Sequence, residues 1–259
     1  MSNPEPMRIT LIGGPTALIE YGGLRLLTDP TFDPPGEHPS GPRTLTKLTG
    51  PAVTLAGLGP IDAVLLSHDH HPDNLDSAGR ALLAQVPKVI TTDAGVERLD
   101  IASAVALEPW QHLELSPPGG GVVTVYGTPA VHGPVGYDAG PVIGFVLAGD
   151  DLPTVYVSGD NASLRVVDEV AENLGPIDGA LLFVGAARTP RIDAYLTLSG
   201  RKAARAAELL DPAWVVPVHA EGWAHFTQGV AEVVEAFDDA DLGHLLRVLE
   251  PGEMGEFEL

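Results

Sequence analysis

The order of strand-like and helix-like segments constrains the fold of this chain most, because strands followed by helices are indicated twice. In the first half, apolar β-branched runs that close on Gly or Asp-Pro indicate a meander, and alternating strand and helix signals follow it. We expect strands at residues 8–12, 17–21, 24–28, 63–66 and 88–91 and a helix at residues 75–85.

The second half repeats that course with a new set of apolar runs. We expect strands at residues 122–126, 142–147, 154–157, 179–183, 214–218 and 245–249 and helices at residues 164–173, 200–210 and 230–237. Two halves that each run from strands to helices indicate two sheets packed between helices. The predicted fold class is α/β, arranged as a four-layer αββα sandwich in one domain of residues 1–259.

The longest stretch that we expect to be irregular covers residues 33–58, and it is rich in Pro, Gly and Thr. Loops of that length are uncommon in compact proteins unless they are functional or mobile. We interpret this stretch as a pocket loop, with a disordered surface insertion as the alternative. His38 lies in it and could touch a substrate, although an exposed loop histidine is the simpler interpretation.

The charge and composition of the chain favour a small-molecule substrate. The formal net charge of −21 repels polyanions, which disfavours binding to nucleic acid. No apolar run approaches the roughly 20 residues that span a bilayer, and residues 1–7 lack the basic and apolar regions of a secretory signal. We therefore expect no membrane span and a cytoplasmic location, and assembly into homo-oligomers is compatible with the sequence.

The sequence contains no cysteine, so any bound metal ion must use imidazole and carboxylate ligands. Such groups are concentrated at residues 67–76, where three histidines and three aspartates follow an apolar strand. His68 and His70 stand two positions apart, and two imidazoles on a loop that leaves a strand can converge on one ion. Zn²⁺ or Mn²⁺ suits nitrogen and oxygen ligands of this kind.

Three further potential ligands occupy the same structural position, because each follows an apolar strand run. They are His132, Asp160 and His219. The ends of strands line the ligand crevice of α/β sheets, so residues that follow several strands can meet there. Any one of them alone would more often be a surface group or a hydrogen-bonded core group. Their repeated position predicts a joint metal site.

These residues match a known family: the chain resembles the metallo-β-lactamase-fold hydrolases, in the branch that contains ascorbate-phosphate lactonase and the phospholipid-cleaving phosphodiesterases. The resemblance covers nearly the whole chain. It includes Leu-Leu-Thr-Asp-Pro at residues 26–30, the run of residues 61–68, Gly159 with Asp160, and His219 followed by residues 221–226. The resemblance implies a metal-dependent hydrolase with the αββα sandwich.

The same resemblance implies two metal ions. The first would be bound by His68, His70 and His132. The second would be bound by Asp73 and His219, and Asp160 would bridge the two ions.

Asp29 would lie behind these ligands according to the resemblance. There it would accept a hydrogen bond from a ligating histidine, which fixes the tautomer and the orientation of the ring. The alternative is a turn-forming aspartate before Pro30.

The segment after His70 departs from the family pattern His-x-His-x-Asp-His, because it has one residue too many. If Asp73 takes the place of the family aspartate, Asn74 stands where a histidine ligand of the second ion is expected. A neutral amide oxygen binds transition metals poorly beside imidazole. Either the second site is weakened but still filled, or the insertion turns His71 round to replace the missing ring. We therefore expect one or two ions of Zn²⁺ or Mn²⁺ per chain.

The predicted chemistry is hydrolysis of an ester, lactone or phosphoester bond in a small molecule. A metal ion can lower the pKa of a bound water toward about 7 and polarise the substrate oxygen. Asp73 could orient that water and pass a proton to the leaving group. His225 is the other candidate proton donor, and its alternative is a packed aromatic cluster with Trp223 and Phe226. A non-catalytic metal-binding or sensor protein with the same fold is the alternative function, because Asn74 could disable the second site.

Overall fold

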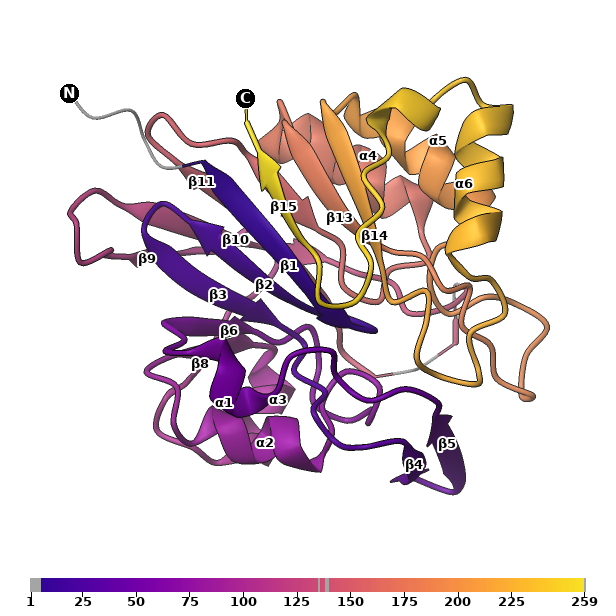
Figure 1. The fold of residues 1–259 in the computed structure, drawn as a ribbon, viewed down its shortest axis with the longest axis horizontal. Coiled ribbons are helices and arrows are strands. Elements are labelled where there is room, and N and C mark those ends of the chain that lie inside the picture. The colour runs from indigo at the N-terminus through magenta and orange to yellow at the C-terminus, as the bar shows by residue number, and fades with distance from the viewer. Residues whose placement is uncertain (1–5, 135, 138–139, 259) are drawn as a thin grey trace.

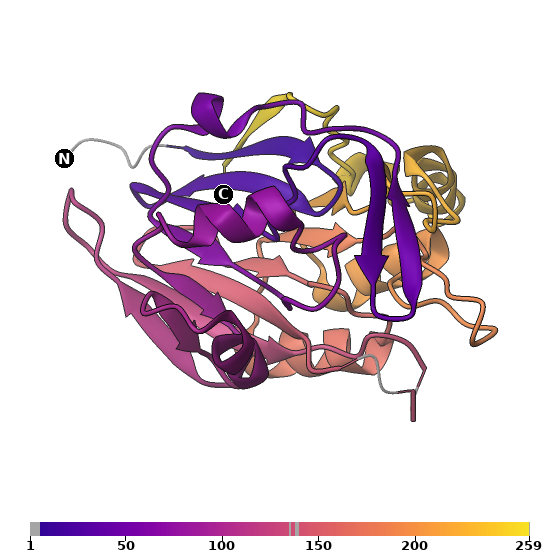
Figure 2. The same ribbon diagram turned by 90° about the horizontal axis from the view of Figure 1, so that it is seen from below.

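The computed structural model describes residues 6–134, 136–137 and 140–258, and its main feature is a pair of β-sheets stacked face to face (Figure 1). Helices cover the outer face of each sheet, which gives the four layers of an αββα sandwich (Figure 2). The predicted fold class is therefore confirmed.

The first sheet has seven strands and is built mainly from the first half of the chain. In spatial order its strands are β15 (Met254–Phe257), β1 (Met7–Gly13), β2 (Thr16–Tyr21), β3 (Leu24–Thr28), β6 (Ala63–Leu65), β7 (Val89–Thr91) and β8 (Ala104–Ala106). Pairing is antiparallel from β15 to β3 and parallel from β3 to β8. Because β3 and β6 are parallel neighbours, the loops that follow them leave the same edge of the sheet side by side.

The second sheet has six strands, all from residues 112–218. In spatial order they are β14 (Trp214–Val218), β13 (Gly179–Phe183), β12 (Val155–Val157), β11 (Ile143–Gly149), β10 (Val123–Pro129) and β9 (His112–Leu115). β12, β13 and β14 pair parallel, and β10 points the same way because β11 is antiparallel to both β10 and β12. The carboxyl ends of β10, β12 and β14 therefore share one edge.

The helices divide between the two outer faces. Those on the first sheet are α1 (Leu55–Leu58), α2 (Ser77–Leu83) and α3 (Asp93–Leu99), and those on the second are α4 (Leu164–Leu174), α5 (Gly200–Leu210) and α6 (Val230–Asp239). Five of these helices begin where a side chain accepts a hydrogen bond from a backbone N–H of the first turn. The capping residues are Thr54, Asp76, Thr92, Ser163 and Ser199.

Alternation along the strands supplies both the inner and the outer cores. In β11, Phe145 belongs to the cluster between the two sheets, whereas its neighbour Val146 belongs to the cluster beneath α4, α5 and α6. In β6, Leu65 lies between the sheets and Val64 faces the helices of the first half. Successive side chains of a strand point to opposite faces, so strands buried on both faces become apolar throughout.

The last predicted strand, at residues 245–249, is wrong. Gly243–Leu245 form a short 3-10 helix, η1, and Leu246 makes a single isolated bridge to Val215. The strand that completes the fold is β15, which pairs with β1 in the sheet of the other half. The remaining predicted strands and helices occur where expected, with shifts of a few residues at their ends.

Residues 33–58 are not irregular, so that prediction is also wrong. They contain a β-hairpin of β4 (Gly36–Ser40) and β5 (Arg43–Lys47), followed by α1. The hairpin is fixed to the second half of the chain, because the N–H of Ala224 donates to the carbonyl of Thr46 at 3.0 Å. A buried ion pair of 2.9 Å between Lys47 Nζ and Asp76 Oδ2 ties its other side to the start of α2. Figures 1 and 2 show the hairpin beside the loops of the second half.

In the described part of the chain, no helix has the length and apolar character needed to cross a bilayer.

Candidate metal centre

The predicted ligands lie at the edge of the sandwich where strands of both halves end. The loop between β6 and α2 carries residues 67–76, and His132, Asp160 and His219 follow β10, β12 and β14. Two groups of three side chains come together at this edge, and within each group the candidate ligand atoms all lie within 4.8 Å of one another.

The first group, here called the histidine group, consists of His68, His71 and His132. Nε2 of His68 and Nδ1 of His71 are 3.0 Å apart. Nδ1–H of His132 donates to the carbonyl of Leu196 at 2.8 Å, which leaves its Nε2 for the group. Burial lowers the pKa of His68 well below its usual value and lowers the pKa of His71 to about 3. Both rings are therefore neutral at physiological pH and offer lone pairs to a metal ion.

His70 lies outside the histidine group, contrary to the predicted ligand set. Its Nδ1 is 3.4 Å from Nη2 of Arg98, and its ring lies so close to Gly140 that a Cβ atom there would be 2.6 Å from Nε2. The rings of His70 and His71 both lie beside that of His68, with centroids 4.7 and 4.9 Å away, but the group of close candidate ligand atoms includes His71 and not His70. The extra residue does not carry His71 into the second group, which was one of the two alternatives for the missing ring.

The second group, here called the aspartate group, consists of Asp73, Asp160 and His219. Nε2 of His219 is 3.4 Å from Oδ2 of Asp73 and 3.6 Å from Oδ1 of Asp160. The other carboxylate oxygen of Asp160 faces the histidine group, at 3.6 Å from Nε2 of His132. Asp160 thus lies between the two groups, which is the position that a bridging ligand requires.

The aspartate group holds opposite charges in close contact. Burial alone would raise the pKa of Asp73, but His225 and His219 outweigh it and hold that pKa well below its usual value. Burial alone would lower the pKa of His219, but Asp160 and Asp73 outweigh it and raise that pKa. The two carboxylates beside His219 therefore favour a positive charge in this place, which a metal ion could supply.

Asn74 and Asp29 support both groups from behind. Asp29 accepts hydrogen bonds from the N–H and hydroxyl of Ser67, at 2.6 and 2.7 Å, and from Nδ2 of Asn74 at 3.2 Å. Because Oγ of Ser67 lies 3.0 Å from Nδ1 of His68, Asp29 orients this histidine through Ser67 and not directly as predicted. Burial raises the pKa of Asp29 to about 7, against the effect of these hydrogen bonds. Nδ2 of Asn74 also lies 3.4 Å from Oδ1 of Asp160.

The backbone turns sharply where these side chains leave the strands. Asp29 has a φ of 27° and His219 a φ of 59°, a left-handed conformation that costs free energy for residues with a Cβ. Gly159, directly before Asp160, has a φ of 54°, and a Cβ atom there would lie 2.6 Å from the carbonyl oxygen of Ile143. The turns direct the following side chains toward the edge between the sheets.

Several buried polar atoms of this centre have no hydrogen-bond partner among the described residues. They are Oδ1 of Asp73, Oδ1 of Asn74, Oδ2 of Asp160 and both ring nitrogens of His219. A buried polar atom without a partner costs about 1–3 kcal/mol, and a metal ion bound to these atoms would remove that cost. Imidazole and carboxylate donors without thiolate fit Zn²⁺ or Mn²⁺.

His225 reaches the aspartate group from the loop after β14. Its Nε2 lies 3.0 Å from Oδ2 of Asp73. Its ring centroid is also 4.6 Å from that of Phe226, in a tilted arrangement, and 6.3 Å from that of Trp223. His225 therefore contacts the aspartate group and also packs in the aromatic cluster, so the two interpretations of this residue are compatible.

Two cavities adjoin the centre and share His71. The first, here called the metal pocket, is lined by Ser40, Arg43, Leu45, His71, Asp73, His132, Ala187, Arg188, Leu196 and His225. The second has a volume of about 590 Å³, and its wall includes His38 and Pro39 of the hairpin. The interpretation of His38 as an exposed loop histidine is wrong, because its ring packs 5.3 Å from that of Trp223.

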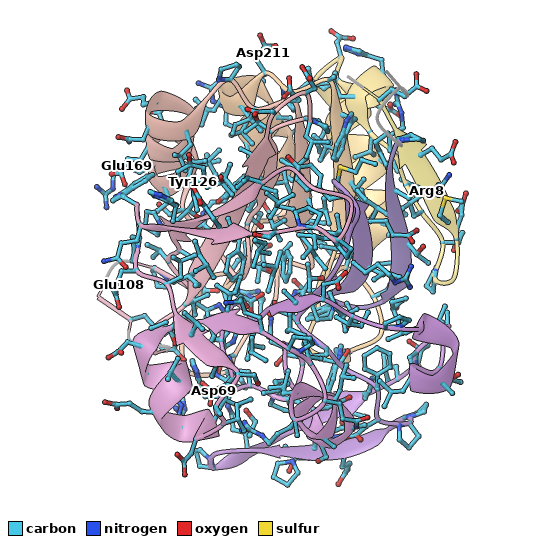
Figure 3. The ribbon with its side chains drawn as sticks, turned by 90° about the vertical axis from the view of Figure 1, so that its left-hand side faces the viewer. Arg8, Asp69, Glu108, Tyr126, Glu169 and Asp211 are labelled. Atoms are coloured by element: carbon cyan, nitrogen blue, oxygen red, sulfur yellow. The ribbon has the colours of Figure 1, made fainter. Side chains whose placement is uncertain are left out.

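Asp69 belongs to neither group, although it stands between two histidines. Its carboxylate forms an ion pair with Arg98 at distances down to 2.5 Å, and its carbonyl accepts a hydrogen bond of 2.9 Å from Arg80. Figure 3 labels Asp69 beside a helix of the first half. These contacts fasten the ligand loop to α2 and α3.

Comparisons with known proteins agree with this geometry. Residues 24–220 match a family model described as the beta-lactamase superfamily domain. A UPF0173 metal-dependent hydrolase from Pyrobaculum neutrophilum is 30% identical over 217 residues, which cover 82% of this chain and 84% of that protein.

Solved structures show the same fold at lower identity. Isothiocyanate hydrolase from Delia radicum gut bacteria is 23% identical with a TM-score of 0.81, over 98% of this chain and 100% of that chain. The metallo hydrolase Igni18 from Ignicoccus hospitalis is 23% identical with a TM-score of 0.71, over 98% of this chain and 99% of that chain.

Proposed function

Because the chain belongs to the β-lactamase superfamily and is a metal-dependent hydrolase, we propose that it hydrolyses an ester, lactone or phosphoester bond of a small molecule. The position of Asp160 carries this proposal, because its two oxygens face three-ligand groups assembled from both halves of the chain. Such an arrangement suits two metal ions that act on one bond.

We assign His68, His71 and His132 to one ion and Asp73, Asp160 and His219 to the other. The unpartnered Oδ1 of Asn74 is a further, weaker donor beside the aspartate group. When bound, Zn²⁺ or Mn²⁺ would polarise the substrate oxygen and lower the pKa of a water molecule toward about 7.

Asp73 and His225 are the residues that we expect to handle protons. The 3.0 Å contact between Oδ2 of Asp73 and Nε2 of His225 lets a proton pass from the carboxylate to the ring. Asp73 orients the attacking water, and His225 delivers a proton to the leaving-group oxygen. Both side chains line the metal pocket, so the proposed proton donor lies beside the proposed reaction centre.

The hairpin gives this hydrolase the means to select substrates. Residues of β4 line both cavities and residues of β5 line the metal pocket, which supports the interpretation of residues 33–58 as a pocket element within one domain of residues 1–259. The cytoplasmic location and the homo-oligomers expected from the sequence stay predictions.

The proposal is tested by metal analysis together with hydrolysis. The purified protein is loaded with Zn²⁺ or Mn²⁺, its ions per chain are counted, and it is assayed on an aryl ester, a lactone, an aryl phosphodiester and an aryl isothiocyanate. The isothiocyanate is included because the structurally similar isothiocyanate hydrolase has this fold. About two ions per chain and hydrolysis of one of the first three substrates, lost on chelation, are expected.

If the protein is instead a non-catalytic metal-binding or sensor protein, the same experiment should give the opposite result. This alternative requires bound metal with no hydrolysis of any substrate, and hydrolysis that stays absent when Asn74→His restores a ring beside the aspartate group. Exclusive hydrolysis of the isothiocyanate would keep the enzyme but replace the proposed bond type.

A further inference from the structure

Arg43 stands at the tip of the hairpin, as the first residue of β5 after the turn at Gly41 and Pro42. Its side chain crosses to the second half of the chain, where Nη1 donates to Oγ1 of Thr189 at 2.6 Å. Together with His71 and Asp73, it lines the metal pocket. A long cationic side chain is therefore held in place beside the proposed reaction centre.

The guanidinium group of Arg43 lacks the partners that an enclosed arginine usually has. Its Nε is buried and has no hydrogen-bond partner among the described residues. No carboxylate of the described chain forms an ion pair with it, whereas Arg80 and Arg98, which line the other cavity, both pair with Asp69. An arginine stays charged in proteins, so this buried N–H is an unsatisfied donor that a ligand with an acceptor oxygen could satisfy.

The positive charge of a metal-loaded centre would make the nearby guanidinium group of Arg43 less favourable. The carboxylates of Asp73 and Asp160 would cancel only half of the charge of two divalent ions, and histidine ligands add no negative charge. A further cation beside this centre is unfavourable unless an anion enters the pocket with the substrate. The overall charge of the chain, −21, also shows that a cation placed here is not part of a generally basic surface.

We propose that Arg43 binds an anionic group of the substrate, so that the natural substrate is an ester, lactone or phosphoester that carries a carboxylate or phosphate near the scissile bond. The two anions share the chemistry that matters, which is a pair of oxygens matched to the planar guanidinium fork. Arg43 is then a specificity-determining residue, and Thr189 positions it. This inference rests on the proposed hydrolytic function of the same pocket.

The kinetic test compares substrates that share a p-nitrophenolate leaving group and differ in charge. They are p-nitrophenyl valerate, which is neutral, mono-p-nitrophenyl glutarate, which carries a carboxylate, and methyl p-nitrophenyl phosphate, which carries the charge on phosphorus. For Arg43→Gln we expect kcat/KM to fall roughly 10- to 100-fold on one or both anionic substrates, mainly through KM. The neutral ester should change less than about threefold, and Arg43→Lys should recover part of the loss.

The matched control is Arg165→Gln, which removes the same charge from an exposed pair with Glu169 on α4. It should leave all three substrates unaffected. Equal losses on neutral and anionic substrates in Arg43→Gln, or no loss on either, would overturn the inference. The pattern across the anionic pair shows whether the carboxylate or the phosphate is the group recognised.

A binding measurement separates this inference from the proposed hydrolysis. Glutarate and inorganic phosphate are titrated into the metal-loaded wild type, Arg43→Gln and Arg165→Gln, after equal metal content has been verified. A dissociation constant raised at least about tenfold in Arg43→Gln alone supports the anion site even if no substrate is hydrolysed. Unchanged affinity overturns the site even if hydrolysis is observed.

Discussion

The histidine group and the aspartate group are adjacent, yet their electrostatics are opposite. In the histidine group, burial keeps His68 and His71 neutral, so the ligands stand ready for a cation without charge of their own. In the aspartate group, two carboxylates raise the pKa of His219, so protons compete with a cation for this site. The centre therefore offers two ions binding sites of unequal electrostatics, and Asp160 is the residue common to both.

The largest effect is expected from Asp160→Asn, because this change removes a charge that both groups use. We expect the metal content to fall below one ion per chain and hydrolysis to fall roughly a thousandfold, or about 4 kcal/mol in transition-state free energy. Atomic absorption and kcat/KM measure the two losses. Asp168→Asn, on the exposed face of α4, is the matched control. Retention of both ions in Asp160→Asn would remove Asp160 from its position as a shared ligand.

A smaller effect distinguishes the two neighbouring histidines. His71→Ala should lose one ion, with hydrolysis reduced roughly 100-fold and with less thermal stabilisation by added metal, because a ligand that binds only the folded state stabilises it by mass action. His70→Ala should keep both ions, since His70 lies outside the histidine group. If His70→Ala loses the ion of the histidine group and His71→Ala keeps it, His70 and not His71 is the ligand.

Acidification should separate the two groups without any mutation. The pKa of His219 is raised, so protons compete for the aspartate group as soon as the pH falls through that raised value, which lies above about 6.5. The pKa values of His68 and His71 are lowered, so protons compete for these two rings only at much lower pH. Metal content measured between about pH 8 and pH 5 should therefore show loss of one ion before the other. Simultaneous loss would contradict the comparison.

The smallest effect is expected from Asp29→Asn, which acts on both groups from behind. Metal affinity should weaken roughly tenfold, because the contact of Asp29 with Ser67 orients His68. In the metal-free protein, burial raises the pKa of Asp29 to about 7, above its unfolded value. Its contribution to stability is therefore complete at acidic pH and is lost as the pH rises toward 7. Asp29→Asn should flatten that decline in a urea unfolding series, and an unchanged pH dependence would argue against the raised pKa.

The sequence predicts the structure correctly where a local pattern determines it. The helix Gly200–Leu210 begins after the capping residue Ser199, and the strand Gly179–Phe183 is apolar on both faces. The strand Met254–Phe257 was missed because three of its four residues are exposed or half-buried, so its apolar signal is weak. Its identity as a strand depends on pairing with β1, which no local pattern reports.

In the metal centre, too, some residues could be predicted from local patterns and others could not. His132, Asp160 and His219 could be singled out because their place depends on where strands end. The resemblance placed His70 with His68 and His132, whereas His71 lies in that group, because no local pattern shows how the ligand loop accommodates its extra residue. Arg43 could not be singled out from the sequence, because the residues of the hairpin strands are mostly exposed or half-buried and lack the apolar alternation that marks a strand in sequence.

The pairing of β15 with β1 has a consequence for the order in which the molecule forms. Arg8 and Glu256, which face each other across this pair at 2.9 Å, are 248 positions apart in the chain. Contacts between such distant residues form late, since the entropy of closing the loop between them must be overcome first. Until then the outer edge of β1 presents unpaired backbone groups, the feature that recruits other strands during aggregation. The slowest step of folding is thus expected to be the pairing of β15 with β1. A chaperone that shields the free edge of β1 until then would raise the yield of folded protein.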